Sequence, residues 1–214
     1  MQIILGVLTE GLVYAILSLG VYITYKILDF PDLSVDGTFP LGAAVTVAMI
    51  LLGAPIPLAM LVATAAGVIF GAITGIINVK FKIRDLISGI IVMTALYSVN
   101  LRIAGKANVP LFSKQTLFEN DVLAKIFPEG MRQYSNLIIL VIIVLIAKIL
   151  LDFYLKTKSG FLLRAVGDND VLVTSLAKDK GNVKILGLAI ANGLAALAGS
   201  VYCQMNGFFE ISIG

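Results

Sequence analysis

The polar side chains best suited to bind a solute lie inside or beside long apolar runs. They are Glu10, Asp32, Asp36, Asn100, Asn192, Gln204 and Asn206. Amide groups at such positions can hydrogen-bond a substrate, but amides in membrane helices also join one helix to another. The two aspartates lie close to Pro31 and Pro40, where they act either as a gate or as capping residues of a solvated turn. The residue types alone leave both interpretations open.

The residues typical of enzyme sites are missing from the sequence. Histidine is absent, Cys203 is the one cysteine, and neither a Gly-x-x-x-x-Gly-Lys-Ser/Thr phosphate loop nor a Gly-x-Ser-x-Gly elbow occurs. We therefore predict no catalytic residue, no metal site, no bound cofactor and no nucleic-acid partner. Without a phosphate loop, the energy for any pumping would come from an ion gradient or from ATP bound by a partner subunit.

The composition places the chain in a membrane. Hydrophobic residues make up 59% of the 214 residues and charged residues 14%, against about 25% charged in soluble domains. Apolar runs long enough to cross a hydrocarbon core lie near residues 3–24, 58–79, 85–105, 137–155 and 185–206. We predict an all-α integral membrane protein, a polytopic bundle of about six transmembrane helices that forms one domain over residues 1–214. In such a fold an ionised side chain at mid-membrane costs about 2.5–3.5 kcal/mol, so Glu10 either lines a polar path or lies near the outer interface.

One apolar run, at residues 41–53, is too short to cross alone. Its 13 residues would span about 20 Å as a helix, so the preceding residues 33–40 must also lie within the membrane domain. We interpret this stretch as a broken or re-entrant segment. The prolines, at positions 31, 40, 55, 57, 110 and 128, all lie outside the predicted spans. Because proline cannot donate a backbone hydrogen bond, we expect all of them in loops.

Basic residues predict the orientation of the spans. Lys80, Lys82 and Arg84 form one cluster, and six further basic residues lie between positions 156 and 184. Short loops rich in lysine and arginine stay in the cytoplasm, and two spans separate these clusters, so both are predicted to be cytoplasmic. This assignment makes the N-terminus extracytoplasmic. The first apolar run lacks a basic leader and a cleavage site, so we expect it to remain as a span.

Small residues recur every fourth position in two spans. One set is Gly67, Gly71 and Gly75, and the other includes Gly187 and Gly199. Such spacing lets a second helix approach closely where lipid provides no hydrophobic drive for association. The pattern predicts a tight helix crossing or a subunit contact, although ordinary glycine usage in membrane helices is the alternative.

The polar segment 156–184 separates the last two spans. Asp168 or Asn169 can cap a short amphipathic helix over residues 171–177, with Gly181 just past its end. The apolar side of that helix would need cover from the membrane domain, from lipid or from a partner protein. A solvated basic connector that only fixes topology is the alternative.

The segment between the third and fourth long spans, residues 106–136, carries a second amphipathic pattern. Its apolar residues are Leu117, Phe118, Val122, Leu123 and Phe127. We expect a helix that rests on the membrane or meets a binding protein.

Two parts of the sequence resemble the permease subunit of ABC importers of the branched-chain amino acid type. One is Lys158-Ser-Gly-Phe-Leu-Leu-Arg-Ala-Val-Gly-Asp-Asn169, followed by residues 182–200 and Gln204-Met-Asn-Gly-Phe208. The other, residues 11–22 and 27–44, is similar to the tryptophan/tyrosine-type branch of these permeases. Such permeases continue with further membrane segments, whereas this sequence ends at Gly214. The resemblance therefore implies either a truncated chain or a looser family boundary.

The resemblance implies a transport subunit without its own ATPase site, in a bacterial inner (plasma) membrane, that imports amino acids or similar small polar solutes. Its implied partners are a cytoplasmic ABC ATPase, a second permease copy in a homodimer, an extracytoplasmic solute-binding protein and membrane lipid. Residues 156–184 would then be a cytoplasmic coupling loop, and residues 160–169 within it would be the coupling helix that docks on the ATPase. The residues implied in coupling to the ATPase are Gly160, Leu163, Arg164, Ala165, Val166, Gly167 and Asn169.

A gradient-driven secondary transporter or channel is the alternative function, and a structural membrane scaffold is a third. A secondary transporter would bury an ionisable coupling site and would not need the polar insert at residues 156–184. The transported substrate cannot be derived, because residues from spans distant in sequence build the pocket.

Overall fold

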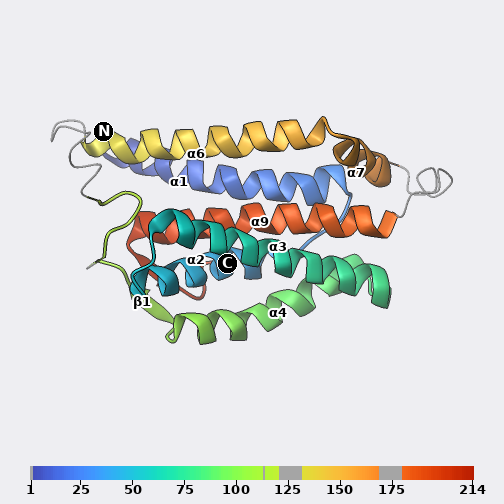
Figure 1. Cartoon of the computed structure of the whole chain (residues 1–214), viewed down its shortest axis with the longest axis horizontal. Coiled ribbons are helices and arrows are strands. Elements are labelled where there is room, and N and C mark those ends of the chain that lie inside the picture. Colours follow the sequence, from blue (N-terminus) through green and yellow to red (C-terminus); the bar gives the residue numbers. More distant parts are fainter. Residues whose placement is uncertain (1, 113, 121–131, 169–179) are drawn as a thin grey trace.

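The computed structural model describes residues 2–112, 114–120, 132–168 and 180–214, and these form a helical bundle (Figure 1). The helices are α1 (Gln2–Val21), the π-helix η1 (Tyr22–Ile27), α2 (Val35–Leu51), α3 (Ile56–Phe81), α4 (Asp85–Ala104), α6 (Arg132–Leu155), α7 (Lys158–Asp168) and α9 (Lys180–Asn206). Two short strands, β1 (Asn108–Pro110) and β2 (Phe208–Glu210), pair antiparallel. Five of the described helical segments are long and apolar enough to cross a membrane, which confirms the predicted all-α polytopic fold.

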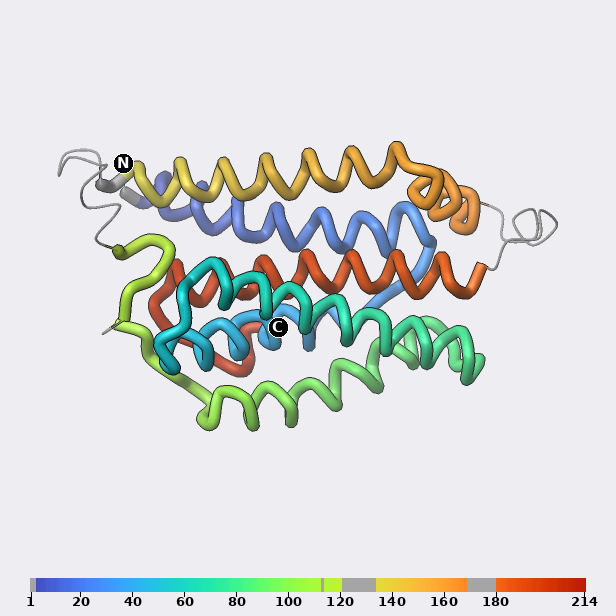
Figure 2. The backbone as a smooth tube through the Cα atoms, viewed as in Figure 1, coloured from blue at the N-terminus to red at the C-terminus, as the bar shows by residue number. Residues whose placement is uncertain are grey.

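The helices are arranged around α9. Helices α1 and α6 run side by side as an outer layer, and α9 lies between this layer and the pair α2 and α3 (Figure 2). Helix α4 packs against α2 on the far side of the bundle. Lipid offers no hydrogen-bond partner to the backbone, so long apolar runs of this kind become helices that satisfy their own backbone groups.

The chain breaks between α1 and α2. Helix α1 continues into η1, where the wider turn is closed by a bond of 3.0 Å from the N–H of Leu28 to the carbonyl of Ile23. A non-helical linker, residues 28–34, follows, and Asp29 within it has a left-handed φ of 51°. Helix α2 then has only 17 residues, or about 25 Å, which is less than the hydrocarbon core. The predicted broken segment is therefore present.

The expectation that every proline lies in a loop is wrong at three positions. Pro57 is in the first turn of α3, where helical N–H groups have no partner and proline is tolerated. Pro110 is in β1, a strand at the edge of a two-stranded sheet. Pro40 is inside α2, so the carbonyl of Asp36 lacks its helical partner, and the backbone at Gly214 packs against this carbonyl.

Glycines bring α3 and α2 into direct backbone contact with α9. A Cβ atom added at Gly75 would lie 2.7 Å from the Cα of Ile185, and additions at Gly67 and Gly71 would collide with the backbone carbonyls of Asn192 and Leu188. The predicted tight helix crossing is therefore the contact between α3 and α9.

The strand pair joins the C-terminal ends of α4 and α9, and residues 111–112 and 114–120 are irregular. Phe118 is buried beside Val13, Phe39 and Leu140. The predicted amphipathic helix is thus wrong for residues 117–120, because these residues form no helix and Phe118 packs into the bundle. Val122, Leu123 and Phe127 of that prediction lie outside the described residues.

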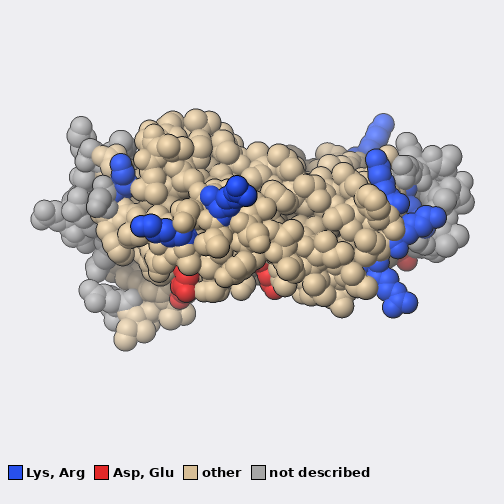
Figure 3. Space-filling view, turned by 90° about the horizontal axis from the view of Figure 1, so that it is seen from below, with Lys and Arg blue, Asp and Glu red and all other residues tan. Residues whose placement is uncertain are grey.

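Basic side chains gather at the end of the bundle where α3 ends, α4 begins and α7 lies (Figure 3). The sequence places Lys80, Lys82 and Arg84 at the α3–α4 turn and Lys156 and Lys158 at the start of α7. The two predicted basic clusters thus share one end of the bundle.

Candidate functional site

A buried polar network joins the linker, α2 and α9 near the middle of the bundle. Asn192 donates from Nδ2 to Oδ2 of Asp32 at 2.8 Å, and its Oδ1 accepts from the Thr38 hydroxyl at 2.7 Å. Ser34 donates from its backbone N–H to Oδ1 of Asp32 at 2.8 Å, and its hydroxyl lies 2.6 Å from the same oxygen. All four side chains are buried, with Asp32 3% exposed. The network therefore holds a carboxyl group inside the protein by hydrogen bonds alone.

Local sequence explains how the linker presents Asp32. An aspartate bonds readily to the N–H two residues ahead, so Asp32 and Ser34 close a turn that leads directly into α2. Gly89 of α4 lies so close to this turn that an added Cβ would stand 2.8 Å from the N atom of Leu33. The turn is therefore fixed between α4 and α9.

A second polar bond joins α2 and α9 nearer the C-terminal ends of both helices. The Thr46 hydroxyl of α2 donates to the Ser200 hydroxyl of α9 at 2.7 Å, and both residues are buried. Buried hydroxyl and amide groups often hold membrane helices together. Asn192 therefore joins helices, one of the two roles considered for it, and it also holds Asp32 in place.

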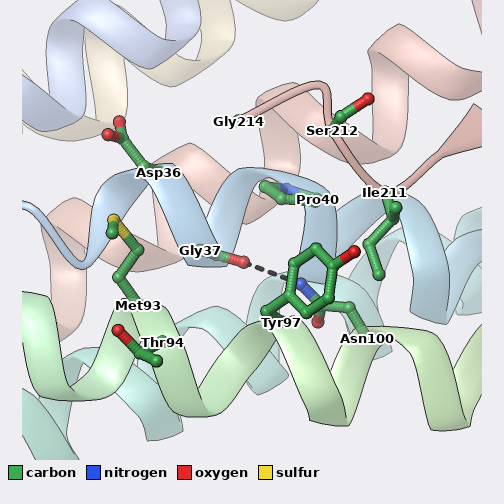
Figure 4. Close-up of a pocket in the computed structure, with 10 residues that line it drawn as sticks. All are labelled: Asp36, Gly37, Pro40, Met93, Thr94, Tyr97, Asn100, Ile211, Ser212 and Gly214. Atoms are coloured by element: carbon green, nitrogen blue, oxygen red, sulfur yellow. Dashed lines mark hydrogen bonds between the residues drawn. The ribbon is translucent and has the colours of Figure 1, made fainter.

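Asp36 of α2 and Asn100 of α4 line a cavity of about 440 Å³ between these two helices (Figure 4). Residues two apart in a helix face different directions, so Thr38 reaches α9 whereas Asp36 is exposed in the cavity. The Asn100 Nδ2 donates to the carbonyl of Gly37 at 3.1 Å. Helix α4 and the chain after β2 form the other walls of the cavity.

The three remaining candidates for the path lie elsewhere. Gln204 is buried near the C-terminal end of α9, and its Oε1 accepts from the N–H of Leu117 at 3.0 Å. This bond holds the irregular segment 114–120 against α9. Asn206 lines a small cavity of about 120 Å³ beside Gln204. Glu10 is exposed on α1, outside both the network and the cavity beside Asp36. The structure thus separates the seven candidates into two groups. Four lie near the middle of the bundle, namely Asp32, Asp36, Asn100 and Asn192, and the other three lie away from them.

The resemblance placed a coupling helix at residues 160–169, and α7 occupies residues 158–168. The predicted C-terminal stop is wrong, because Gly181 is in the first turn of α9 instead of following a helix end, and Asp168 is the last residue of α7. The predicted helix over residues 171–177, together with Asn169, lies outside the described residues.

Only one side of α7 is available to a partner. Gly160, Leu163 and Val166 are buried against the bundle, so we remove them from the predicted contact surface. Among the described residues of the helix, Lys158, Phe161, Arg164 and Asp168 are exposed at spacings of three and four. These four residues form what we call the α7 outer strip, and Arg164 is the residue it shares with the prediction.

The inner side of α7 packs on η1 and the start of the linker. A Cβ atom at Gly167 would collide with the carbonyl of Ile27, and one at Gly187 of α9 would lie 2.6 Å from both Leu163 and Leu28. Leu163, Val166, Ile27 and Leu28 belong to one buried apolar cluster. Helix α7 is therefore in direct contact with the start of the linker that carries Asp32.

Sequence reasoning missed several residues of this region. Ser34 and Thr38 complete the network, and Thr94 and Tyr97 line the cavity. The Asp-Leu-Ser spacing at residues 32–34 was the available signal, because it is typical of a side-chain turn before a helix. Among the described residues, no three histidine, cysteine, aspartate or glutamate side chains lie close enough together to hold a metal ion.

Comparison with known proteins gives consistent matches along the chain. The family model described as branched-chain amino acid transport system / permease component matches residues 3–214. A tyrosine transport system permease protein of Clostridioides difficile strain R20291 is 46% identical over 99% of this chain and 68% of its own length. The uncharacterized protein RP368 of Rickettsia prowazekii strain Madrid E is 37% identical over 100% of this chain and 72% of its own length.

A more distant relative is the guanosine ABC transporter permease protein NupP of Bacillus subtilis strain 168. It is 29% identical over 68% of this chain and 42% of its own length. No solved structure gives a significant match. The match over nearly all residues and the polytopic helical fold agree with the resemblance seen in the sequence. The chain belongs to the family of branched-chain amino acid transport system permease components.

Proposed function

We propose that this protein is the membrane-spanning permease subunit of an ATP-driven ABC importer for amino acids or similar small polar solutes. Its proposed partners are a cytoplasmic ABC ATPase, a second copy of the permease and an extracytoplasmic solute-binding protein. The observation that carries the proposal is α7, which exposes one narrow strip at the basic end of the bundle and packs its other side on the linker to Asp32.

The proposed mechanism transmits ATPase movement through these contacts. An ATPase that docks on the α7 outer strip displaces α7, and the contact between Gly167 and Ile27 passes the displacement to the linker. The linker carries Asp32 and Ser34, whose bonds to Asn192 have a limited set of geometries. A packed element of this kind changes between discrete arrangements and does not deform continuously. Making and breaking the network would then open and close the path beside α2.

ATP itself would be bound by the partner, because the sequence has no phosphate loop. The basic end with α7 would face the cytoplasm of a bacterial cell, in the inner membrane, and the N-terminus would lie outside. L-Tyrosine is the first solute to test, because a relative 46% identical to this chain carries tyrosine transport in its name.

The test is a coupling measurement on the Arg164→Glu variant. The permease would be reconstituted with its ATPase and binding protein in proteoliposomes, and L-tyrosine uptake and ATP hydrolysis would be measured together. Reversing the charge on the α7 outer strip should lower uptake by about tenfold or more while the ATPase still hydrolyses ATP. Arg102→Glu, in the last turn of α4 at the opposite end of the bundle, is the matched control and should leave coupling intact. Normal coupling in Arg164→Glu would count against ATPase docking on α7.

A gradient-driven transporter remains the second candidate because of one observation, the buried carboxyl group of Asp32. Such a transporter needs an ionisable group inside the membrane domain, and Asp32 has no basic partner among the described residues. The two candidates differ in their energy source. Uptake that continues without ATP and stops when a protonophore is added would favour the gradient-driven mechanism.

A further inference from the structure

We propose that an open groove between α6 and α9 binds one acyl chain of an anionic phospholipid, whose headgroup is held at the basic end of the bundle. The groove has a volume of about 500 Å³. It is bordered by Thr64 of α3, by one face of α6 between Ile143 and Tyr154, and by α9 between Ile190 and Leu197. The inference goes beyond the proposed function, because it assigns a lipid site and no step of transport.

The walls of the groove exclude a polar ligand. Every lining residue except Thr64 and Tyr154 is aliphatic. The Thr64 hydroxyl donates to the carbonyl of Met60 at 2.8 Å, and the Tyr154 hydroxyl lies 3.2 Å from the Ser159 hydroxyl. Both polar side chains are therefore bonded within the protein. A polar solute in the groove would lose its hydrogen bonds to water without gaining others, so the complementary ligand is apolar.

The groove runs through only one half of the membrane domain. From Ile143 to Tyr154, α6 rises by about 16 Å, close to half of a hydrocarbon core of about 30 Å. Beyond Ile143 the gap is closed, because Leu140 of α6 and Val201 of α9 pack into one buried cluster with Phe118. An acyl chain of one leaflet has this length, whereas a transmembrane helix of a partner would run through the whole core.

The open end of the groove lies at the basic end of the bundle, where α6 ends and α9 begins (Figure 1). Lys156 follows Tyr154 by two positions, and Lys184 precedes the first lining residue of α9 by six, or about 9 Å. The one acidic residue within four positions of either lysine, Asp152, pairs with Lys148 at 2.7 Å.

These lysines identify the headgroup. A lysine near the end of a membrane helix lays its alkyl chain along apolar surface and extends its ammonium group to the headgroup layer. Basic residues at that level attract anionic lipids, and tyrosine is enriched at the same depth. An apolar groove of one-leaflet length with a basic mouth therefore fits a phospholipid that carries a net negative charge.

The test uses tryptophan as a fluorescent reporter, because the sequence contains none. Leu150→Trp places the indole in the groove wall, where the leucine is 64% exposed. Ile149→Trp is the matched control, because Ile149 is at the same depth of α6, is 50% exposed and does not line the groove. The full protein would be reconstituted in mixtures of phosphatidylglycerol and phosphatidylcholine. One of the two lipids at a time would carry bromine on its acyl chains, which quenches tryptophan on contact.

Quenching of Leu150→Trp should show a preference for phosphatidylglycerol of about threefold or more, and Ile149→Trp should show none. Combining Lys156→Gln with Lys184→Gln should abolish the preference at Leu150→Trp. Lys80→Gln with Lys82→Gln removes the same charge from the α3–α4 turn, at the same end of the bundle, and should leave the preference unchanged.

Three results would overturn the proposal. If neither lipid quenches Leu150→Trp, protein covers the groove. If both tryptophan positions show the same headgroup preference, or neither shows any, the lipid at the groove is ordinary bilayer lipid. If the Lys156 and Lys184 substitutions leave the preference intact, these lysines do not hold the headgroup. The experiment involves neither an ATPase nor a solute, so its outcome is independent of the proposed function.

Discussion

Helix α9 and the outer layer of α1 and α6 are all apolar and of similar length, yet they occupy opposite environments. In the most apolar part of α9, 67% of residues are buried, against 17% in α1 and in α6. The buried side of α9 consists of small and polar residues, such as Gly187, Asn192 and Gly199. Helix α6 instead exposes large side chains, such as Leu150 and Phe153.

The difference shows that hydrophobicity does not select the central helix. Lipid is as apolar as a leucine side chain, so burial inside a membrane protein brings no hydrophobic gain. Small residues allow close backbone contact, and buried amides and hydroxyls need partners that lipid cannot supply. Helix α9 is central because it has both.

The largest effect should come from filling the closest contact of α9. Gly199→Leu places a side chain against the backbone carbonyl of Phe39 in α2, where no space exists, and the cost should be about 3 kcal/mol or more. Gly11→Leu on α1 is the matched control, because nothing lies within 4 Å of an added Cβ there. The measurement is thermal unfolding of the purified protein in detergent. Equal stability of the two variants would contradict the proposed difference between central and outer helices.

An intermediate effect is expected from Asn192→Ala, which removes the bonds of the network to Asp32, Thr38 and Ser34 and leaves Asp32 with fewer donors. A hydrogen bond to a charged group contributes about 1.5–3 kcal/mol, so unfolding should be easier by about that amount. In an Asp32→Asn background the same change should cost only about 1 kcal/mol, because no carboxylate is left unpaired. Ser18→Ala on α1, whose hydroxyl bonds its own helix, is the control and should change little. Additive effects of the two substitutions would show that Asp32 and Asn192 act independently.

The smallest effect is expected in the outer layer. Asp152 pairs with Lys148 at 2.7 Å on the exposed surface of α6, one helical turn away. Because solvent screens such a pair, Asp152→Asn should leave the unfolding temperature unchanged within error. A clear loss of stability in this variant would mean that α6 depends on polar contacts as α9 does.

Several features of the fold follow from the sequence with simple physical rules. The long spans, the broken segment before α2 and the shared end of the two basic clusters were predicted from run length and charge. The position of α7 came from family resemblance, whereas capping rules placed a helix after Asp168 and missed the one before it. Capping residues mark both the beginnings and the ends of helices, so Asp168 alone did not define a direction.

The candidate site was only partly predictable. Asp32, Asp36, Asn100 and Asn192 were recognised as polar residues in an apolar context, but not as members of two different sites. Asp36 and Thr38 are two residues apart and face opposite sides of α2, which separates the cavity from the network. The prediction of an amphipathic helix in residues 106–136 was wrong at Phe118 for a related reason. Phe118 fits an amphipathic pattern, yet its side chain packs on α1 and α6 instead of on lipid.

The sequence by itself determined that the chain forms membrane helices and that one segment is broken, because run length and local charge act over short distances along the chain. Only the tertiary structure decided which helix is central, which polar residues meet and which side of α7 is free. Those outcomes depend on contacts between residues as much as 160 positions apart, such as Asp32 and Asn192. In a membrane, where every apolar face is equally acceptable to lipid, close packing and hydrogen-bond pairing select these contacts, and hydropathy does not.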